Sequence, residues 1–187
     1  MISFRNVTKT FGSGPTTVRA IRDLSFTLPQ GEFWSIMGPS GSGKTTVLHL
    51  IAGLTPPTSG SVLVGGDDVA RMTPAEAAAL RRRRIGYILQ SFNLMPFLTA
   101  TENVGIPLVL DGVKQSEIDR RVQDALAMVN MSHRAQHQPS QLSGGEQQRI
   151  AVARALVIQP AIILADEPTG NLDRTAGRAV MDLIQDV

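Results

Sequence analysis

A glycine-rich segment, GPSGSGKT at residues 38–45, has the residue types that bind polyphosphate. It fits the pattern G-x-x-x-x-G-K-[ST] in full, between an apolar stretch and a helical pattern. Gly41 and Gly43 place no Cβ in the way of inward-pointing backbone amides, and the next helix adds its positive N-terminal end. We predict that Lys44 contacts the β and γ phosphates and that Thr45 offers its hydroxyl to Mg²⁺. The alternative, a simple glycine turn before a helix, leaves the complete match unexplained.

Two adjacent carboxylates, Asp166 and Glu167, follow the apolar run at residues 162–165. Successive side chains at a strand tip point in different directions, so one acid can reach Mg²⁺ while the other faces a water molecule. We therefore assign Asp166 to the metal and Glu167 to the attacking water. Two acids after a strand are by themselves most often loop residues, and it is the phosphate loop that favours the catalytic interpretation.

The motif LSGGE at residues 142–146 opens a further helical pattern. Ser143 and Glu146 form an ordinary capping box, which explains a well-started helix and nothing more. Gly144 and Gly145 go beyond that, because glycine lowers helix stability and two glycines leave bare, positive amides suited to an anion. The motif predicts a second phosphate-binding helix end.

Hydrophobic periodicity and capping signals predict the elements that position these residues. We expect strands at residues 18–28, 33–37, 61–64, 85–89 and 161–165, and helices at 45–52, 73–83, 101–109, 116–130, 143–157 and from 174 to the end. No strand pattern interrupts residues 91–157. One α/β domain is expected over residues 1–187, with a core at 1–90 and 159–187 and a helical subdomain at 91–158.

Composition excludes several classes of protein. The chain has 187 residues, 42% of them hydrophobic, which suffices for one substantial core. It has no cysteine, hence no disulfide framework, and no apolar run of the roughly 18 residues that span a bilayer. We expect a cytoplasmic location. The net charge of +2 and pI of about 9.5 reflect a predominance of arginine and are weak evidence for a nucleic-acid partner.

The basic run at residues 81–84 closes a predicted helix, where cations are favoured by the helix dipole; a binding patch is the alternative. The histidines, His49, His133 and His137, share no metal-binding spacing with nearby acids. We interpret them as surface or helix residues.

Four features together resemble the ABC ATPase family: GPSGSGKT, Gln90 after its strand, LSGGEQQRIAVARAL and IILADEPTGNLD. The resemblance covers nearly the whole chain, and LSGGE distinguishes this family from other phosphate-loop proteins. It implies a P-loop NTPase α/β core with a mainly parallel sheet, an N-terminal antiparallel β portion and an inserted α-helical subdomain. It also implies a head-to-tail dimer, formed with a second copy of the chain or with a paired ABC subunit. Two ATP molecules would each lie between one subunit's phosphate loop and the other's LSGGE helix.

The resemblance also implies site residues. Nucleotide contacts are implied for Phe11, Gly38, Pro39, Ser40, Gly41, Ser42, Gly43, Lys44, Thr45, Thr46, Ser143, Gly144, Gly145 and Glu146. Phe11 would stack on adenine, with a core aromatic as its alternative role. Mg²⁺ ligation is implied for Thr45, Gln90 and Asp166, and catalysis for Glu167, Gln90 and Lys44. Asp173 matches an aspartate that couples the two sites, although it also suits the N-cap of the last helix.

The stretch QSFNLMPFLTATENVGIPL and the wording DEPTGNLD resemble the group of lipoprotein-releasing and macrolide-exporting ATPases. This implies an ATPase subunit at the inner face of the cell membrane, bound to a membrane-spanning permease, with no nucleic-acid partner. The apolar residues Phe92, Leu94, Met95, Phe97 and Leu98 are the expected partner surface, with core packing as the alternative.

One departure from the family concerns the C-terminal part. The family has a histidine on a further strand beyond the last aspartate motif, and no histidine follows Asp173, so this strand and its switch histidine are missing before Val187. A truncated or regulatory ATP-binding module with impaired hydrolysis is therefore the alternative function. An ABC protein of DNA repair or translation would have a long coiled-coil insertion or a second copy of the motifs, and this sequence has neither. A GTPase would have the base-reading motif NKxD, which is also missing. Both classes are therefore disfavoured.

Overall fold

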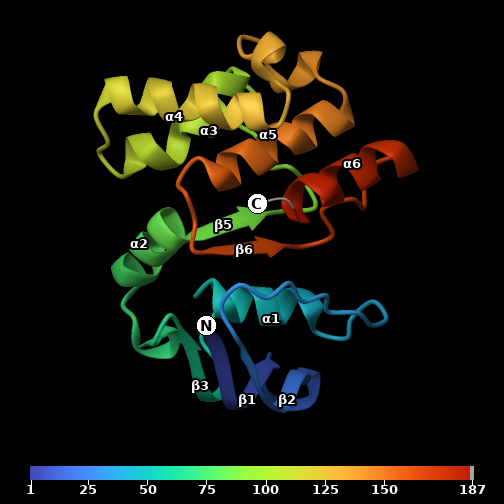
Figure 1. The fold of residues 1–187 in the computed structure, drawn as a ribbon. Helices are drawn as coiled ribbons and strands as arrows, with labels where there is room; N and C mark the ends of the chain where they lie inside the picture. Colours follow the sequence, from blue (N-terminus) through green and yellow to red (C-terminus); the bar gives the residue numbers. More distant parts are fainter. Residues whose placement is uncertain (186–187) are drawn as a thin grey trace. The chain divides into compact units, whose positions relative to one another are not determined.

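The computed structural model describes residues 1–185 and forms two compact units, Met1–Leu80 and Arg81–Val187, named here the N-terminal and C-terminal units. Figure 1 shows the elements. The strands are β1 (Ile2–Phe11), β2 (Val18–Leu28), β3 (Ser59–Val64), β4 (Asp67–Asp68), β5 (Ile85–Ile88) and β6 (Ile162–Ala165). The α-helices are α1 (Lys44–Ile51), α2 (Pro74–Arg84), α3 (Ala100–Leu110), α4 (Gln115–Met128), α5 (Gly144–Leu156) and α6 (Arg174–Gln185). Short 3-10 helices lie at Gly14–Thr16, Val69–Arg71, Ser132–Arg134 and Pro139–Gln141.

The N-terminal unit is an antiparallel sheet in the order β2-β1-β3-β4, with helix α1 packed against β2 and β3. The alternation of β1 buries Ile2, Phe4 and Val7, and α1 buries Val47 and Leu50. Removing these side chains from water is what holds the helix to the sheet. The expected N-terminal antiparallel β portion is confirmed.

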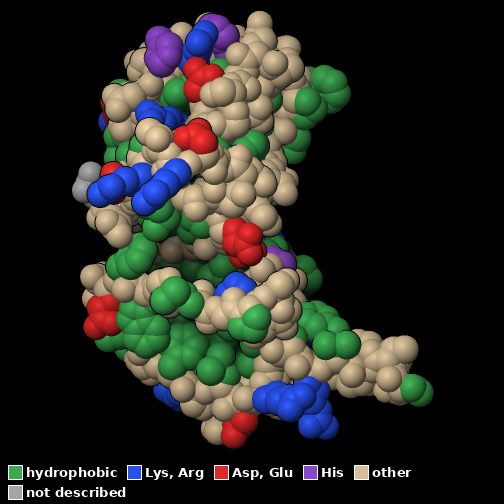
Figure 2. All heavy atoms as spheres, turned by 90° about the vertical axis from the view of Figure 1, so that its right-hand side faces the viewer, with side chains coloured by type: hydrophobic (Ala, Val, Ile, Leu, Met, Phe, Trp, Pro, Cys, Tyr) green, Lys and Arg blue, Asp and Glu red, His purple; other side chains and the backbone are tan. Residues whose placement is uncertain are grey.

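The strand expected at residues 33–37 is wrong, because this segment has no strand hydrogen-bond ladder in the described chain. Phe33, Trp34 and Met37 are exposed, and the Trp34 ring stacks on Phe26 with centroids 5.7 Å apart. Figure 2 shows hydrophobic side chains gathered on the surface of the N-terminal unit. The apolar run suits a strand, but a strand also needs a paired neighbour, which local composition does not reveal.

The C-terminal unit is built on the parallel pair β5 and β6, whose register runs from Ile85 opposite Ile162 to Ile88 opposite Ala165. Helix α5 packs on β5, and helices α3 and α4 pack on α5, as Figure 1 shows. The contact between α5 and β5 is close enough that a Cβ on Gly86 would lie 2.6 Å from the carbonyl oxygen of Ala155. Glycine at this position lets the helix approach the strand.

The predicted helices are confirmed, most of them within two residues of their expected ends. Helix α2 has its predicted capping box, in which the N–H of Thr73 donates to Glu76 Oε2 at 2.7 Å. Helix α6 is described as far as Gln185; the expected continuation to the end of the chain, Asp186 and Val187, lies outside the described residues. No helix within residues 1–185 is long and apolar enough to cross a bilayer.

The basic run at residues 81–84 forms the last turn of α2. Arg82 and Arg83 each donate to Asp111 at 2.8 Å, and their hydrogen bonds lower the pKa of that carboxyl. Two of the four arginines thus have an internal ion pair, as the dipole interpretation of this run allows.

Candidate functional site

The phosphate loop connects directly to helix α1, with Gly43 as N-cap. Gly41 and Gly43 have φ angles of 78° and 93°, in the left-handed region that favours glycine. Lys44 Nζ donates to the carbonyl oxygens of Gly38 and Pro39, each at 3.0 Å. The loop is therefore folded by contacts within six residues of the chain, and an ammonium group lies at its carbonyls.

A steric constraint also requires glycine at position 43. A Cβ there would lie 2.6 Å from the carbonyl oxygen of Ala20 on β2, whereas a Cβ on Gly41 would meet nothing within 4 Å. Thr45 and Thr46 occupy the first turn of α1. The sequence identifies the whole loop, but the close approach to β2 is visible only in the structure.

The aromatic residue Phe11 ends strand β1 opposite Val18 and is 44% exposed. The ammonium group of Lys9 lies 4.8 Å from the centre of its ring. The ring is therefore not a core aromatic: the Lys9 ammonium covers part of it, and its exposed part is accessible to a planar ligand.

Asp166 and Glu167 follow strand β6, and the N–H of Asp166 continues the ladder by donating to Ile88 at 2.9 Å. Gln90, which lies beyond the end of β5, donates from Nε2 to Glu167 Oε2 at 2.9 Å. The parallel pairing of β5 with β6 explains this meeting, since the carboxyl ends of parallel strands share one edge of the sheet. Two predicted catalytic residues, 77 positions apart, are thus in direct contact.

Glu167 has a φ of 46°, an unusual backbone conformation for a residue with a Cβ. The following turn is closed by the N–H of Gly170, which donates to the carbonyl of Glu167 at 3.0 Å. A Cβ on Gly170 would lie 3.2 Å from Gln90 Nε2 and 3.4 Å from Glu167 Oε2, so this glycine makes room for the pair.

Asn171 is a functional candidate that sequence reasoning missed. Its Nδ2 donates to the carbonyl oxygen of Gln90 at 2.8 Å, so the residue that contacts Glu167 is also held at its backbone. A lone asparagine in a loop gives no signal of a contact 81 residues away. Asp173 accepts from the N–H of Thr175 at 2.9 Å and of Ala176 at 3.1 Å, which confirms the N-cap of α6.

Tyr87 on strand β5 is an ionisable residue near the carboxyl ends of β5 and β6. Its pKa is raised to about 12, first because burial disfavours the phenolate and then because the Asp166 carboxylate repels it. The hydroxyl therefore stays protonated near neutral pH.

The N-terminus of helix α5 has the predicted capping box. The N–H of Ser143 donates to Glu146 Oε2 at 2.8 Å, and the N–H of Glu146 donates to Ser143 Oγ at 3.3 Å. Gly144 and Gly145 begin the helix, so their N–H groups have no partner in a preceding turn. This end presents two backbone amides to an anion, with the Ser143 side chain beside them.

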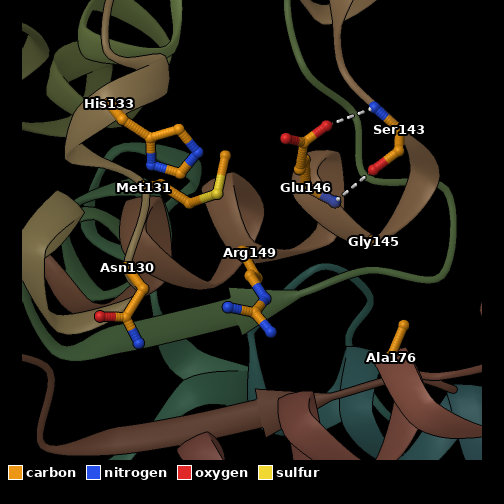
Figure 3. Close-up of a pocket in the computed structure, with 8 residues that line it drawn as sticks. All are labelled: Asn130, Met131, His133, Ser143, Gly145, Glu146, Arg149 and Ala176. Carbon is orange, nitrogen blue, oxygen red and sulfur yellow. Dashed lines mark hydrogen bonds between the residues drawn. The ribbon is translucent and has the colours of Figure 1, made fainter.

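A cavity of about 290 Å³ lies beside this helix end. It is lined by Asn130, Met131, His133, Ser143, Gly145, Glu146, Arg149 and Ala176, which Figure 3 shows as sticks. Sequence reasoning identified Ser143, Gly145 and Glu146 but missed the others, which come from different segments. Among the described residues no cluster of three or more His, Cys, Asp or Glu side chains can hold a metal ion.

Glu146 is held from a second side, because Arg134 Nε donates to its Oε1 at 3.0 Å. The pKa of Glu146 is lowered, chiefly by the backbone N–H of Ser143 and also by the Ser143 hydroxyl and Arg134, against the opposing effect of burial. The ionised carboxylate thus ties the 3-10 helix Ser132–Arg134 to the start of α5.

Comparisons with known proteins identify the family to which this chain belongs. The family model described as ABC transporter matches residues 21–170. An uncharacterized ABC transporter ATP-binding protein of Thermotoga maritima is 47% identical over 96% of this chain and 77% of its own length. The lipoprotein-releasing system ATP-binding protein LolD of Geobacter metallireducens is 44% identical over 100% of this chain and 83% of its own length.

Two solved structures have the same fold. Both are dimers of the ATP-binding cassette MJ0796, one of them in a post-hydrolysis state bound to ADP and Pi. They are 42% and 44% identical to this chain with TM-scores of 0.90, and the matches cover 98% of this chain and 81% of theirs. The expected fold class is confirmed, and the chain belongs to the ABC transporter family as one of its ATP-binding, ATP-hydrolysing subunits.

Proposed function

We propose that this chain binds ATP with Mg²⁺, closes around it as a dimer and hydrolyses it with Glu167 as the carboxylate that polarises the attacking water. The hydrogen bond from Gln90 Nε2 to Glu167 Oε2, 2.9 Å long, carries the proposal. Glu167 is exposed, and its Oε1 accepts no hydrogen bond within the described residues. One carboxylate oxygen is thus oriented by an amide while the other is open to a water, as a general base requires.

The phosphate loop supplies the binding contacts in this proposal. A polyphosphate would replace the carbonyls of Gly38 and Pro39 as the partner of Lys44, and the loop amides would hold its oxygens. The face of Phe11 would receive the adenine. These steps use one continuous, locally folded segment and one exposed ring.

Mg²⁺ fits the donors that we assign to it, Thr45, Gln90 and Asp166. They offer a hydroxyl, an amide and a carboxylate, which are the hard oxygen ligands that this ion prefers. When bound it would neutralise charge on the phosphate oxygens. The residues of the chain then hold the nucleotide and orient the water.

The N-terminus of α5 is the proposed contact to the ATP of a second subunit. Gly144 and Gly145 present two backbone amides beside the Ser143 side chain, and the helix dipole adds positive potential. The two solved structures described above are dimers. Hydrolysis would therefore depend on dimer closure, because each ATP needs donors from both copies.

The membrane partner would bind the loop between β5 and α3. Phe97 is 86% exposed and Met95 53% exposed, whereas Leu94 packs against the core. Asn103 is buried and fixes this loop through hydrogen bonds with Met95 N–H at 2.7 Å, Met95 O at 3.1 Å and Leu98 O at 3.0 Å. Met95 and Phe97 are thus the proposed contacts that hold the subunit at the inner face of the membrane.

The domain boundaries remain our proposal, with a nucleotide-binding core at residues 1–90 and 159–187 and a helical subdomain at 91–158.

The proposal about transport rests on relationship alone. LolD is named for a lipoprotein-releasing system, and the 44% identity of this chain to LolD supports a related function at the cell envelope.

The test is steady-state ATP hydrolysis by the chain beside Glu167→Gln, with nucleotide binding measured in parallel. We expect the variant to lose at least about 10²-fold in turnover, because an amide cannot accept the proton, while it keeps its ATP affinity. Glu32→Gln is the matched control, since Glu32 accepts a hydrogen bond from Trp34 and has no part in the site.

The result that contradicts this role is equal turnover by Glu167→Gln and the native chain. Binding without turnover in either protein would support the ATP-holding module, an alternative that the relatives do not favour.

A further inference from the structure

Arg154, in the last turn of helix α5, makes contacts that the proposed function does not use. Its Nη1 donates to the carbonyl oxygen of Asn93 and its Nη2 to that of Phe92, both at 2.6 Å. Arg154 forms no ion pair with a carboxylate in the described part of the chain, and burial lowers its pKa. A largely buried guanidinium is thus used to bind two consecutive backbone carbonyls.

The turn that it binds is unusual. Phe92 and Asn93 have φ angles of 40° and 48°, so two consecutive residues with side chains adopt the left-handed conformation. This backbone is unfavourable for any residue with a Cβ and most of all for a bulky one, so it persists where surrounding groups hold it. The fork of Arg154 spans the two carbonyls of the turn.

The turn also connects the two parts of the catalytic arrangement. It follows Gln90 by two residues, and the Gln90 amide is the donor to Glu167. On its other side, a Cβ on Gly144 would lie 3.9 Å from Cζ of Phe92. The Phe92 ring therefore lies near the first residue of α5, while Arg154 in the last turn of α5 binds the turn directly.

We propose that Arg154 is a positioning residue, which clamps the Phe92–Asn93 turn to helix α5 so that the Gln90 amide and the Ser143–Gly145 end of α5 move as one piece. This inference rests on the proposed function of Gln90 and Glu167.

Arg154→Lys in the full chain tests the clamp, because lysine keeps the charge but has no planar fork to bind both carbonyls. We expect amide exchange at residues 92–94 to become about tenfold faster and kcat for ATP to fall about tenfold, with less than about a twofold change in KM. Arg120→Lys is the control: Arg120 lies exposed on α4, paired with Glu117 and Asp124, and should change none of these quantities.

A second pair of variants acts on the turn without altering the packing of α5. Asn93 is exposed, and alanine there disfavours the left-handed conformation, whereas glycine adopts it freely. We expect Asn93→Ala to lower kcat severalfold and Asn93→Gly to retain it. Asn93→Gly should also restore part of the activity that Arg154→Lys loses.

The inference is overturned if Arg154→Lys and Asn93→Ala loosen the turn but leave kcat unchanged, or if Arg154→Lys lowers only the Tm. The side-chain amide resonance of Gln90 separates this outcome from a failure of the proposed function. If the native chain hydrolyses no ATP, Arg154→Lys must still shift that resonance for the clamp to stand.

Discussion

The phosphate loop and the pair of Gln90 and Glu167 are built in opposite ways. The loop is closed by contacts between Lys44 and residues five and six positions earlier. The pair joins residues 77 positions apart, and Gln90 is held in turn by Asn171, 81 positions away.

Their strained backbones differ in the same manner. The loop places glycine where φ is positive, at Gly41 and Gly43, so the conformation needs little support. The other region has positive φ at Phe92, Asn93 and Glu167, which depend on their surroundings. Closure of the phosphate loop is therefore encoded locally, whereas turnover depends on the packing of the whole C-terminal unit, and mutations that loosen that unit should remove hydrolysis before binding.

The strongest challenge to the local character of the loop is Gly43→Ala, compared with Gly41→Ala. Both need a left-handed alanine, which costs about 1 kcal/mol, but only the Cβ at Gly43 would meet Ala20 O at 2.6 Å. We expect Gly43→Ala to destabilise the N-terminal unit by about 3 kcal/mol in urea unfolding and to abolish ATP binding. Equal losses in the two variants would mean that the contact with β2 is unimportant.

Gly86→Ala tests whether turnover depends on distant packing. Its Cβ would lie 2.6 Å from Ala155 O and force β5 away from α5, at a cost of about 2 kcal/mol. Below its melting temperature we expect this variant to bind ATP normally and hydrolyse it slowly. Gly105→Ala, whose Cβ would be 3.4 Å from Ile118, is the control and should leave stability equal or raised by up to about 1 kcal/mol.

Asn171→Ala removes the hydrogen bond to Gln90 O and tests whether turnover depends on this one distant contact. This hydrogen bond contributes about 1 kcal/mol to holding Gln90 in place. Its loss should lower kcat about fivefold and leave the nucleotide Kd unchanged. Asn171→Asp should be worse, because it places an acceptor against the Gln90 carbonyl. Unchanged kcat in both variants would show that Gln90 needs no support at its backbone.

The smallest effect concerns Glu146 and pH. Its folded pKa lies below the ordinary 4.5, so its ionised form contributes stability above about pH 4.5, and this is lost as the pH falls through the folded pKa. Glu146→Gln keeps an acceptor for Ser143 but loses the charge that pairs with Arg134. We expect the free energy of unfolding of the native chain to exceed that of the variant by less than about 1 kcal/mol at neutral pH and to equal it in strong acid. Urea unfolding at each pH measures this difference.

Local signals predicted the parts of this molecule that are locally determined. The phosphate loop, the capping box at Ser143 and Glu146 and the strand of residues 18–28 each follow from neighbouring residues. The error at residues 33–37 has the opposite cause, since pairing depends on a distant strand. Asn171 and Arg154 escaped notice for the same reason, because each acts on a backbone carbonyl more than 60 residues away.

The single tryptophan and single tyrosine of the chain fall in different units, with Trp34 stacked on Phe26 in one and Tyr87 half-buried and affected by the Asp166 charge in the other. The chain therefore has a natural optical reporter in each unit. Indole fluorescence follows melting of the N-terminal sheet, and near-ultraviolet absorbance of the phenol follows the β5 edge. Two melting curves that do not coincide would separate loss of the binding half from loss of the hydrolytic half without any introduced label.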